Sequence, residues 1–256
     1  RELKYFALNH DEVLTSEGTK VSFKVVRSLS EPGTRTLLDL EMKSKSNTLG
    51  VEVAHPFIRA RSQNLTVRGA FDYKNTESFQ LGARSSHDRL RSLRLGVDYD
   101  YTDEWKGVNL ASFEASRGLK VLHSTSNDYA LASRADGRVD YTKATLNLSR
   151  TQQLPNSFSL YTSAMGQWAP HQLLSAEECG MGGEQYGRAY DSSEITGDRC
   201  AMGSAELRYL PQVDIPSLQY VQLYGFYDIG RTWNINPPAG TSKRDSLASS
   251  GAGLRF

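Results

Sequence analysis

Residues of alternating polarity recur along most of the chain. The clearest case is Leu93–Tyr101, where every second residue is Leu, Val or Tyr and the residues between them are Arg94, Gly96, Asp98 and Asp100. A period of two is typical of a β-strand whose two faces meet different surroundings. The pattern therefore predicts strands with one apolar and one polar face.

Eleven segments are predicted to be strands, and no segment has a helical amphipathic pattern. Turns are expected at Thr15–Gly18, Glu31–Thr34 and Leu154–Ser157, a long polar loop at Lys120–Arg138, and a strand end or barrel rim at Pro56. Short turns that alternate with long loops are typical of outer-membrane barrels. The predicted strands are Glu2–Leu14, Thr19–Leu29, Leu49–Phe57, Asn64–Tyr73, Leu93–Tyr101, Glu104–Gly118, Val139–Gln152, Phe158–Trp168, Ala201–Leu210, Gln219–Trp233 and Ser246–Phe256.

The same alternation is compatible with a membrane β-barrel and with a soluble β-sandwich. The formal net charge is +1 and both signs are scattered, which argues against a nucleic-acid-binding protein. A transmembrane helix is excluded because no run of about 18 apolar residues exists, whereas a membrane strand needs only about 9–11 residues. The opening Arg1–Lys4 has no apolar core, so we expect a mature chain or a piece of a larger one.

A glycine-rich segment, Cys179–Tyr209, interrupts the strands and contains both cysteines, Cys179 and Cys200. In an oxidising compartment these two could form a disulfide that stabilises by about 3 kcal/mol, and the alternative is two free thiols. The spacing does not resemble a metal site. We therefore expect no bound metal.

Catalytic motifs are missing from the sequence. Gly182–Ala189 approaches a phosphate-binding loop, but Arg188 stands in place of its lysine and Ala189 lacks the hydroxyl that binds Mg²⁺. No G-x-S-x-G or H-E-x-x-H motif occurs, and the acidic pair Glu177–Glu178 is expected to be solvated. The sequence predicts neither an enzyme nor a cofactor.

Five stretches carry a resemblance to a known family, and they spread over most of the chain. In family order they are Ala54–Leu65, Ser149–Pro155, Gly182–Asp198, Ser204–Tyr209 and Gly225–Trp233. Together they resemble the hemolysin secretion/activation family, the outer-membrane transporters of two-partner secretion, which join periplasmic POTRA domains to a sixteen-stranded barrel. The resemblance implies that residues 1–256 are part of an all-β, antiparallel transmembrane barrel, that loop 171–200 folds into its lumen, and that the POTRA domains lie outside this chain.

The resemblance also implies the site residues. The loop motif is Gly182, Gly183, Gly187, Arg188, Ala189 and Tyr190, with Ala189 where the family usually has glycine. In the family this arginine pairs with an acidic residue of the barrel wall, which corresponds here to Asp228, close to Gly230. Alternation independently places Asp228 on the polar face of its strand. The alternative is an ordinary surface ion pair of little energetic value.

The predicted lumen lining carries both signs of charge, which suits an unfolded polypeptide better than a selected ion. Together with this pattern, the resemblance implies a monomeric outer-membrane pore, surrounded by lipid, that passes a secreted partner exoprotein in extended form. The alternatives are a β-protein assembly factor of the same superfamily and a soluble β-sandwich that binds carbohydrate, whose charges would face bulk water. The lining residues are Arg68, Asp72, Arg94, Asp98, Asp100, Lys143, Glu206 and Arg208, besides Asp228.

Overall fold

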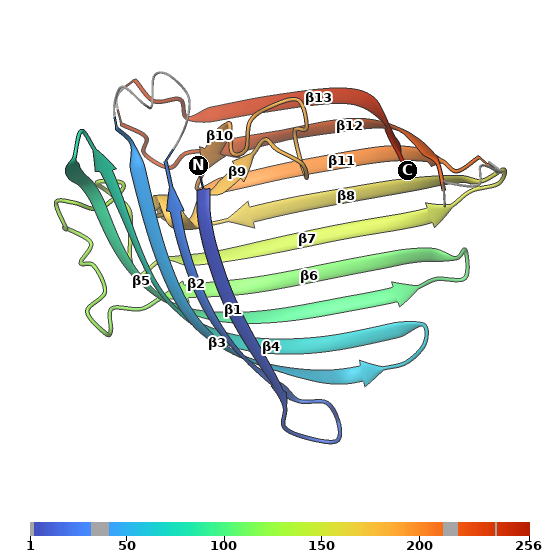
Figure 1. Cartoon of the computed structure of the whole chain (residues 1–256), viewed down its shortest axis with the longest axis horizontal. Coiled ribbons are helices and arrows are strands. Elements are labelled where there is room, and N and C mark those ends of the chain that lie inside the picture. Colours follow the sequence, from blue (N-terminus) through green and yellow to red (C-terminus); the bar gives the residue numbers. More distant parts are fainter. Residues whose placement is uncertain (1–2, 32–40, 212–219, 239) are drawn as a thin grey trace.

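A single curved antiparallel sheet of eleven strands dominates the computed structural model, which describes residues 3–31, 41–211, 220–238 and 240–256 (Figure 1). Neighbouring strands in the sheet follow chain order, apart from a short hairpin between β8 and β11 that forms a second, two-stranded sheet. The strands of the main sheet are β1 (Leu3–Val13), β2 (Lys20–Ser30), β3 (Lys43–Arg59), β4 (Gln63–Gln80), β5 (Ala83–Thr102), β6 (Gly107–Gly118), β7 (Thr142–Gln153), β8 (Phe158–Trp168), β11 (Arg199–Tyr209), β12 (Gln222–Trp233) and β13 (Arg244–Arg255).

The two faces of this sheet have opposite polarity. On one face, here called the apolar face, large side chains are exposed: Leu95 is 59% exposed and Ile229 is 52% exposed. On the other, the polar face, Asp72, Glu206 and Asp228 are buried. A soluble protein buries its apolar side chains, so this distribution is the reverse of the usual one. It is the distribution expected of a sheet with lipid against its apolar face.

The predicted strand pattern is confirmed, with differences in length. β4 and β5 extend well beyond the predicted segments and pair from Gln63↔Tyr101 to Gln80↔Ala83. β3 continues through Pro56 to Arg59, so the proline does not end the strand, and a register shift lies between Pro56 and Ile58. Most of the predicted turn at Glu31–Thr34 lies outside the described residues.

The connections between strands differ at the two ends of the sheet. At one end, residues 14–19, 60–62, 103–106 and 154–157 form short turns. At the other end, residues 81–82 form a tight turn between β4 and β5, whereas residues 119–141 and 169–198 form long loops, as expected for the polar segment Lys120–Arg138. Among the described residues, no helix is both long and apolar enough to cross a membrane.

The soluble β-sandwich is the wrong alternative. A sandwich needs a second sheet packed on the apolar side chains. Within the described ranges, the second sheet is only the hairpin of β9 (Cys179–Met181) and β10 (Ile195–Gly197). This hairpin contacts β11, β12 and β13 beside the buried acids of the polar face. Large side chains of the apolar face, such as Leu95 and Ile229, therefore stay exposed among the described residues.

Two small apolar clusters take the place of a central core. One lies where the two long loops meet β5, and it contains Leu90, Val139, Tyr141, Leu173 and Leu174, with Ala169. The other lies between the hairpin and the wall strands, and it contains Cys179, Met181, Tyr186, Cys200 and Met202. Both clusters fix the loops to the sheet. Among the described residues, the buried apolar contacts therefore serve mainly to position the two long loops, including the hairpin.

Candidate functional site

The hairpin ends in a compact turn, residues 182–194, whose shape depends on glycine. Gly182 and Gly187 have φ values of +122° and +89°, a region in which side chains are strained. A Cβ on Gly182 would also lie 2.0 Å from the carbonyl oxygen of Asp191. Ala189 has a negative φ, so the turn accommodates alanine where the family usually has glycine. Backbone hydrogen bonds from Gly182 N to Tyr186 O (2.8 Å) and from Tyr190 N to Gly187 O (2.9 Å) close the turn.

Arg188 projects from this turn to Asp228 of β12. Its Nη2 and Nε donate to the two carboxylate oxygens at 2.9 and 3.1 Å. The backbone N–H groups of Gly187 and Arg188 also donate to Asp228, at 3.2 and 3.1 Å. A bidentate arginine–carboxylate pair with two further backbone donors fixes both direction and distance. The turn is therefore held against the wall in one defined position.

The opposite side of the guanidinium reaches β11. Arg188 Nη1 donates to Glu206, and Nη2 donates to Ser204 Oγ at 3.1 Å. The guanidinium carbon lies 3.6 Å from the centre of the Phe226 ring, a cation–π contact. Burial lowers the pKa of Arg188, but Asp228 and Glu206 outweigh burial and raise it above its ordinary value. We call Arg188 with Asp228 and Glu206 the tip anchor.

Behind the tip anchor, the hairpin packs on the wall through sulfur-containing side chains. Cys179 and Cys200 form a disulfide, with their Cα atoms 6.4 Å apart, which joins β9 to the start of β11. Met181 is fully buried. A Cβ on Gly230 would lie 2.5 Å from Met181 Sδ, so only glycine leaves room for that side chain. Tyr190, which is 37% exposed, donates from its hydroxyl to the carbonyl of Ala248 in β13 at 3.2 Å.

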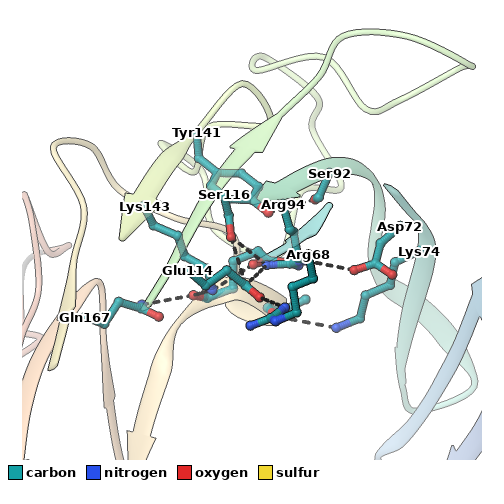
Figure 2. Close-up of polar contacts among 12 residues, drawn as sticks. Arg68, Asp72, Lys74, Ser92, Arg94, Glu114, Ser116, Tyr141, Lys143 and Gln167 are labelled. Atoms are coloured by element: carbon teal, nitrogen blue, oxygen red, sulfur yellow. Dashed lines mark hydrogen bonds and ion pairs between the residues drawn. The ribbon is translucent and has the colours of Figure 1, made fainter. Parts of the chain in front are cut away.

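The other predicted lining residues also make polar contacts on this face, and Figure 2 shows four of them, Arg68, Asp72, Arg94 and Lys143. Arg68 donates to Asp98 at 3.0 Å and to Glu114 at 2.7 Å. Asp100 accepts from Asn64 at 2.9 Å. In a separate cluster, Glu206 accepts from Arg208 at 2.7 Å and from Arg255 at 2.8 Å, besides Arg188. The face thus carries paired charges of both signs rather than a field of one sign.

Glu177 contradicts the prediction that the acidic pair Glu177–Glu178 is solvated. Its side chain is only 3% exposed and lies between Arg94 of β5 and Lys143 of β7. Burial raises its pKa, but Lys143 and Arg94 outweigh burial and lower the pKa to about 2. Glu178 is also largely buried and pairs with Arg134 at 2.8 Å. From the sequence alone these two adjacent acids look like a solvated pair, because their partners are 34 to 83 residues away in the chain.

Asp198, another buried acid of the loop 169–198, connects the long loops to each other. It accepts from Arg134 of the loop 119–141, from the backbone N–H of Leu173 at 2.7 Å, and from the backbone N–H of Ile235 at 2.7 Å. Asp198 is fully buried. Sequence reasoning missed this residue, because nothing in its local pattern indicates donors from three separate connections.

Fold and site together define a class of protein: a curved, antiparallel membrane-type sheet with an arginine-bearing hairpin folded onto its polar face. Comparison with known proteins narrows this class. Residues 27–256 match the family described as Haemolysin secretion/activation protein ShlB/FhaC/HecB, and the chain belongs to this family. The family and the outer-membrane location predicted from the sequence are confirmed, and the curated relative is named as a transporter.

One curated relative is similar in sequence, and solved structures share the fold. The outer membrane transporter CdiB of Dickeya dadantii (strain 3937) is 27% identical over 150 residues, which is 59% of this chain and 26% of the relative. The structure of CdiB from Escherichia coli matches with a TM-score of 0.79 at 19% identity, over 98% of this chain and 46% of that chain. BamA from Haemophilus ducreyi lacking POTRA domains 1–3 matches with a TM-score of 0.68 at 13% identity, over 99% and 56%. The chain therefore spans about a quarter of the curated relative and about half of the solved structures.

Proposed function

We propose that this chain forms part of the wall of an outer-membrane pore through which a secreted partner protein passes in extended form. In the parent protein the sheet closes into a barrel. Its apolar face contacts lipid and its polar face contacts water. The hairpin then lies in the lumen, and the parent acts as a monomer. The observation that carries this proposal is the tip anchor, in which a loop arginine is bound to buried acids on the polar side of a sheet whose apolar side is exposed.

The polar face suits the passage of an unfolded polypeptide. Such a chain needs solvation of its backbone groups, which hydroxyls, amides and hydrated charges provide. Because the arginines and acids of the face are already paired with one another, they bind a passing charge weakly. The pathway needs no cofactor, and folding of the exported protein outside the cell supplies the driving force.

The hairpin is the part that must move. In its docked position it covers the wall at β11 to β13 and occupies space that an extended polypeptide would need. Release of Arg188 from Asp228 and Glu206 frees the turn while the disulfide keeps the start of the hairpin beside β11. We infer that partner engagement shifts the tip anchor from bound to released.

An assembly factor that inserts β-proteins is the second candidate of the same superfamily, and the likeness to BamA is compatible with it at the level of the fold. The family match favours secretion, because it extends over residues 27–256 and its members are described as secretion proteins.

Secretion by an Arg188→Ala variant of the full-length parent tests the proposal. We expect secretion of the partner to fall by at least tenfold, while the amount of folded protein in the outer membrane stays unchanged. Arg150→Ala is the matched control. Arg150 of β7 also pairs with an acid, at 2.5 Å, but this acid, Asp103, lies in the turn between β5 and β6, away from the hairpin. Normal export by Arg188→Ala, with insertion intact, would overturn the proposal.

A further inference from the structure

We infer that the hairpin has a second anchor at its base, formed by Glu177 with Arg94 and Lys143, in which the loop residue is an acid rather than an arginine. This base anchor restricts movement to the tip, residues 180–196. The inference rests on the proposed function, in which the hairpin shifts during transport. It adds which part of the loop moves and which residues keep the rest in place.

The base anchor is built around the whole of Glu177. Glu177 Oε1 accepts from Arg94 Nη2 at 2.9 Å, and Oε2 lies 2.8 Å from Lys143 Nζ. The backbone carbonyl of Glu177 accepts from Lys143 Nζ and from Gln167 Nε2, both at 3.1 Å. Side chain and backbone of one residue are thus bound to three strands, β5, β7 and β8.

The wall side of this anchor is itself held in place. Arg94 Nε donates to Asp72 at 2.8 Å, and its Nη1 donates to Ser116 at 2.9 Å (Figure 2). Lys143 is 9% exposed and projects from the start of β7. Because these partners already have fixed positions, Glu177 fits a preformed cationic site. Removing its charge would leave the buried Lys143 without an acid in the described part of the chain, which is strongly unfavourable, whereas Arg94 would keep Asp72 and Glu114.

The two anchors differ in sign and in position. At the base an acid of the loop binds cations of β5 and β7, and at the tip a cation of the loop binds acids of β11 and β12. A passing cation that binds the wall acids in place of Arg188 therefore meets wall cations, and no such acid, at the base anchor. This arrangement allows the tip to be released while the base stays bound.

Two further contacts close the other end of the base. Asp198 binds Arg134 and two backbone N–H groups directly after β10, and the disulfide Cys179–Cys200 joins the two sides of the hairpin to the wall. Between these fixed points lie residues 180–196, whose ionic contact with the wall is the tip anchor. Residues 180–196 of the hairpin therefore move while its base stays fixed to the wall.

Cysteine labelling of the purified full-length protein in detergent separates movement of base and tip. Ala176→Cys reports on the base, since Ala176 packs against the buried cluster around Leu173. Ser249→Cys reports on the tip, since Ser249 is 7% exposed and contacts Asp228 beneath it. The probe is a small polar maleimide, and the readout is the labelling rate of each cysteine.

Glu177→Gln should raise the labelling rate of Ala176→Cys at least tenfold, and Lys143→Met should do the same if the first variant does not fold. Arg188→Ala should raise the rate of Ser249→Cys and leave that of Ala176→Cys within twofold. Glu184→Gln is the control and should change neither rate, because Glu184 is exposed and makes no ion pair in the described part of the chain.

Two results would overturn the inference: an unchanged Ala176→Cys rate in Glu177→Gln and Lys143→Met, or an equal rise of both rates in Arg188→Ala, which means that the loop moves as one body. The labelling does not depend on secretion. If base and tip respond separately while Arg188→Ala still exports its partner, the inference stands and the proposed function fails.

Discussion

Replacing Asp228 by asparagine removes one charge from the tip anchor and leaves the volume of the side chain almost unchanged. Asp228 is fully buried and accepts from Arg188, from two backbone N–H groups, and from Ser204 Oγ at 2.7 Å. An asparagine has one oxygen, and its amide group faces donors that it cannot bind. Breaking one partner of a buried ion pair costs about 3–5 kcal/mol, and Glu206 retains part of the interaction with Arg188. A loss of about 3 kcal/mol is therefore reasonable for docking of the tip.

A loss of about 3 kcal/mol increases the undocked population by roughly 100-fold. When docking is fast, the labelling rate of a covered residue is proportional to that population. In Ser249→Cys, the second substitution Asp228→Asn should therefore raise the maleimide rate by about two orders of magnitude. Asp103→Asn is the control, because Asp103 also binds an arginine, Arg150, away from the hairpin. An unchanged rate at Ser249→Cys in Asp228→Asn would refute the view that this carboxylate keeps the tip docked.

Two further predictions concern packing and pH. Gly230→Ala should weaken docking by about 1–3 kcal/mol, because its Cβ overlaps Met181 Sδ at 2.5 Å, and it should accelerate labelling of Ser249→Cys. Gly225→Ala should not, since the nearest atom to its Cβ is 3.8 Å away, and equal rates in the two variants would contradict the packing argument. Because the pKa of Glu177 is lowered from 4.5 to about 2, its contribution to docking is complete above pH 4.5 and is lost as the pH falls towards 2. Amide hydrogen exchange at residues 175–178, corrected for intrinsic rates, should rise over that interval in the natural protein and show no such pH dependence in Glu177→Gln.

Period-two alternation predicted most of the sheet, because each strand has one face suited to lipid and one face suited to water. Leu93–Tyr101 is recognisable from its own residues, and the structure places its leucines and valine on the exposed face. The extension of β4 and β5 beyond residues 73 and 93 was missed. In that part, polar residues such as Asn75 and Thr76 occupy both faces, so the alternation disappears although the pairing continues.

The site was predictable only in part. Arg188 and Asp228 could be named as partners because a family motif marks both. The position of Glu206 on the polar face follows from alternation, which also places Arg208 beside it on the same strand. Its binding of Arg188 and Arg255 does not follow, since these residues come from the infolded hairpin and from β13. Glu177 was assigned to solvent for the same reason. Its cations come from β5 and β7, and no local pattern relates them to a loop after β8.

The central claim is that the polar face of this sheet lines the path of the exported protein, and two adjacent residues of β6 test it most directly. Ser112 donates to Asp98 at 2.6 Å on the polar face, whereas Phe113 is 45% exposed on the apolar face. A photo-crosslinking amino acid is placed at either position of the full-length parent while its partner is being secreted. The account predicts that position 112 crosslinks to the partner and position 113 does not. Crosslinks to the partner from position 113, or none from position 112 while secretion proceeds, would contradict it.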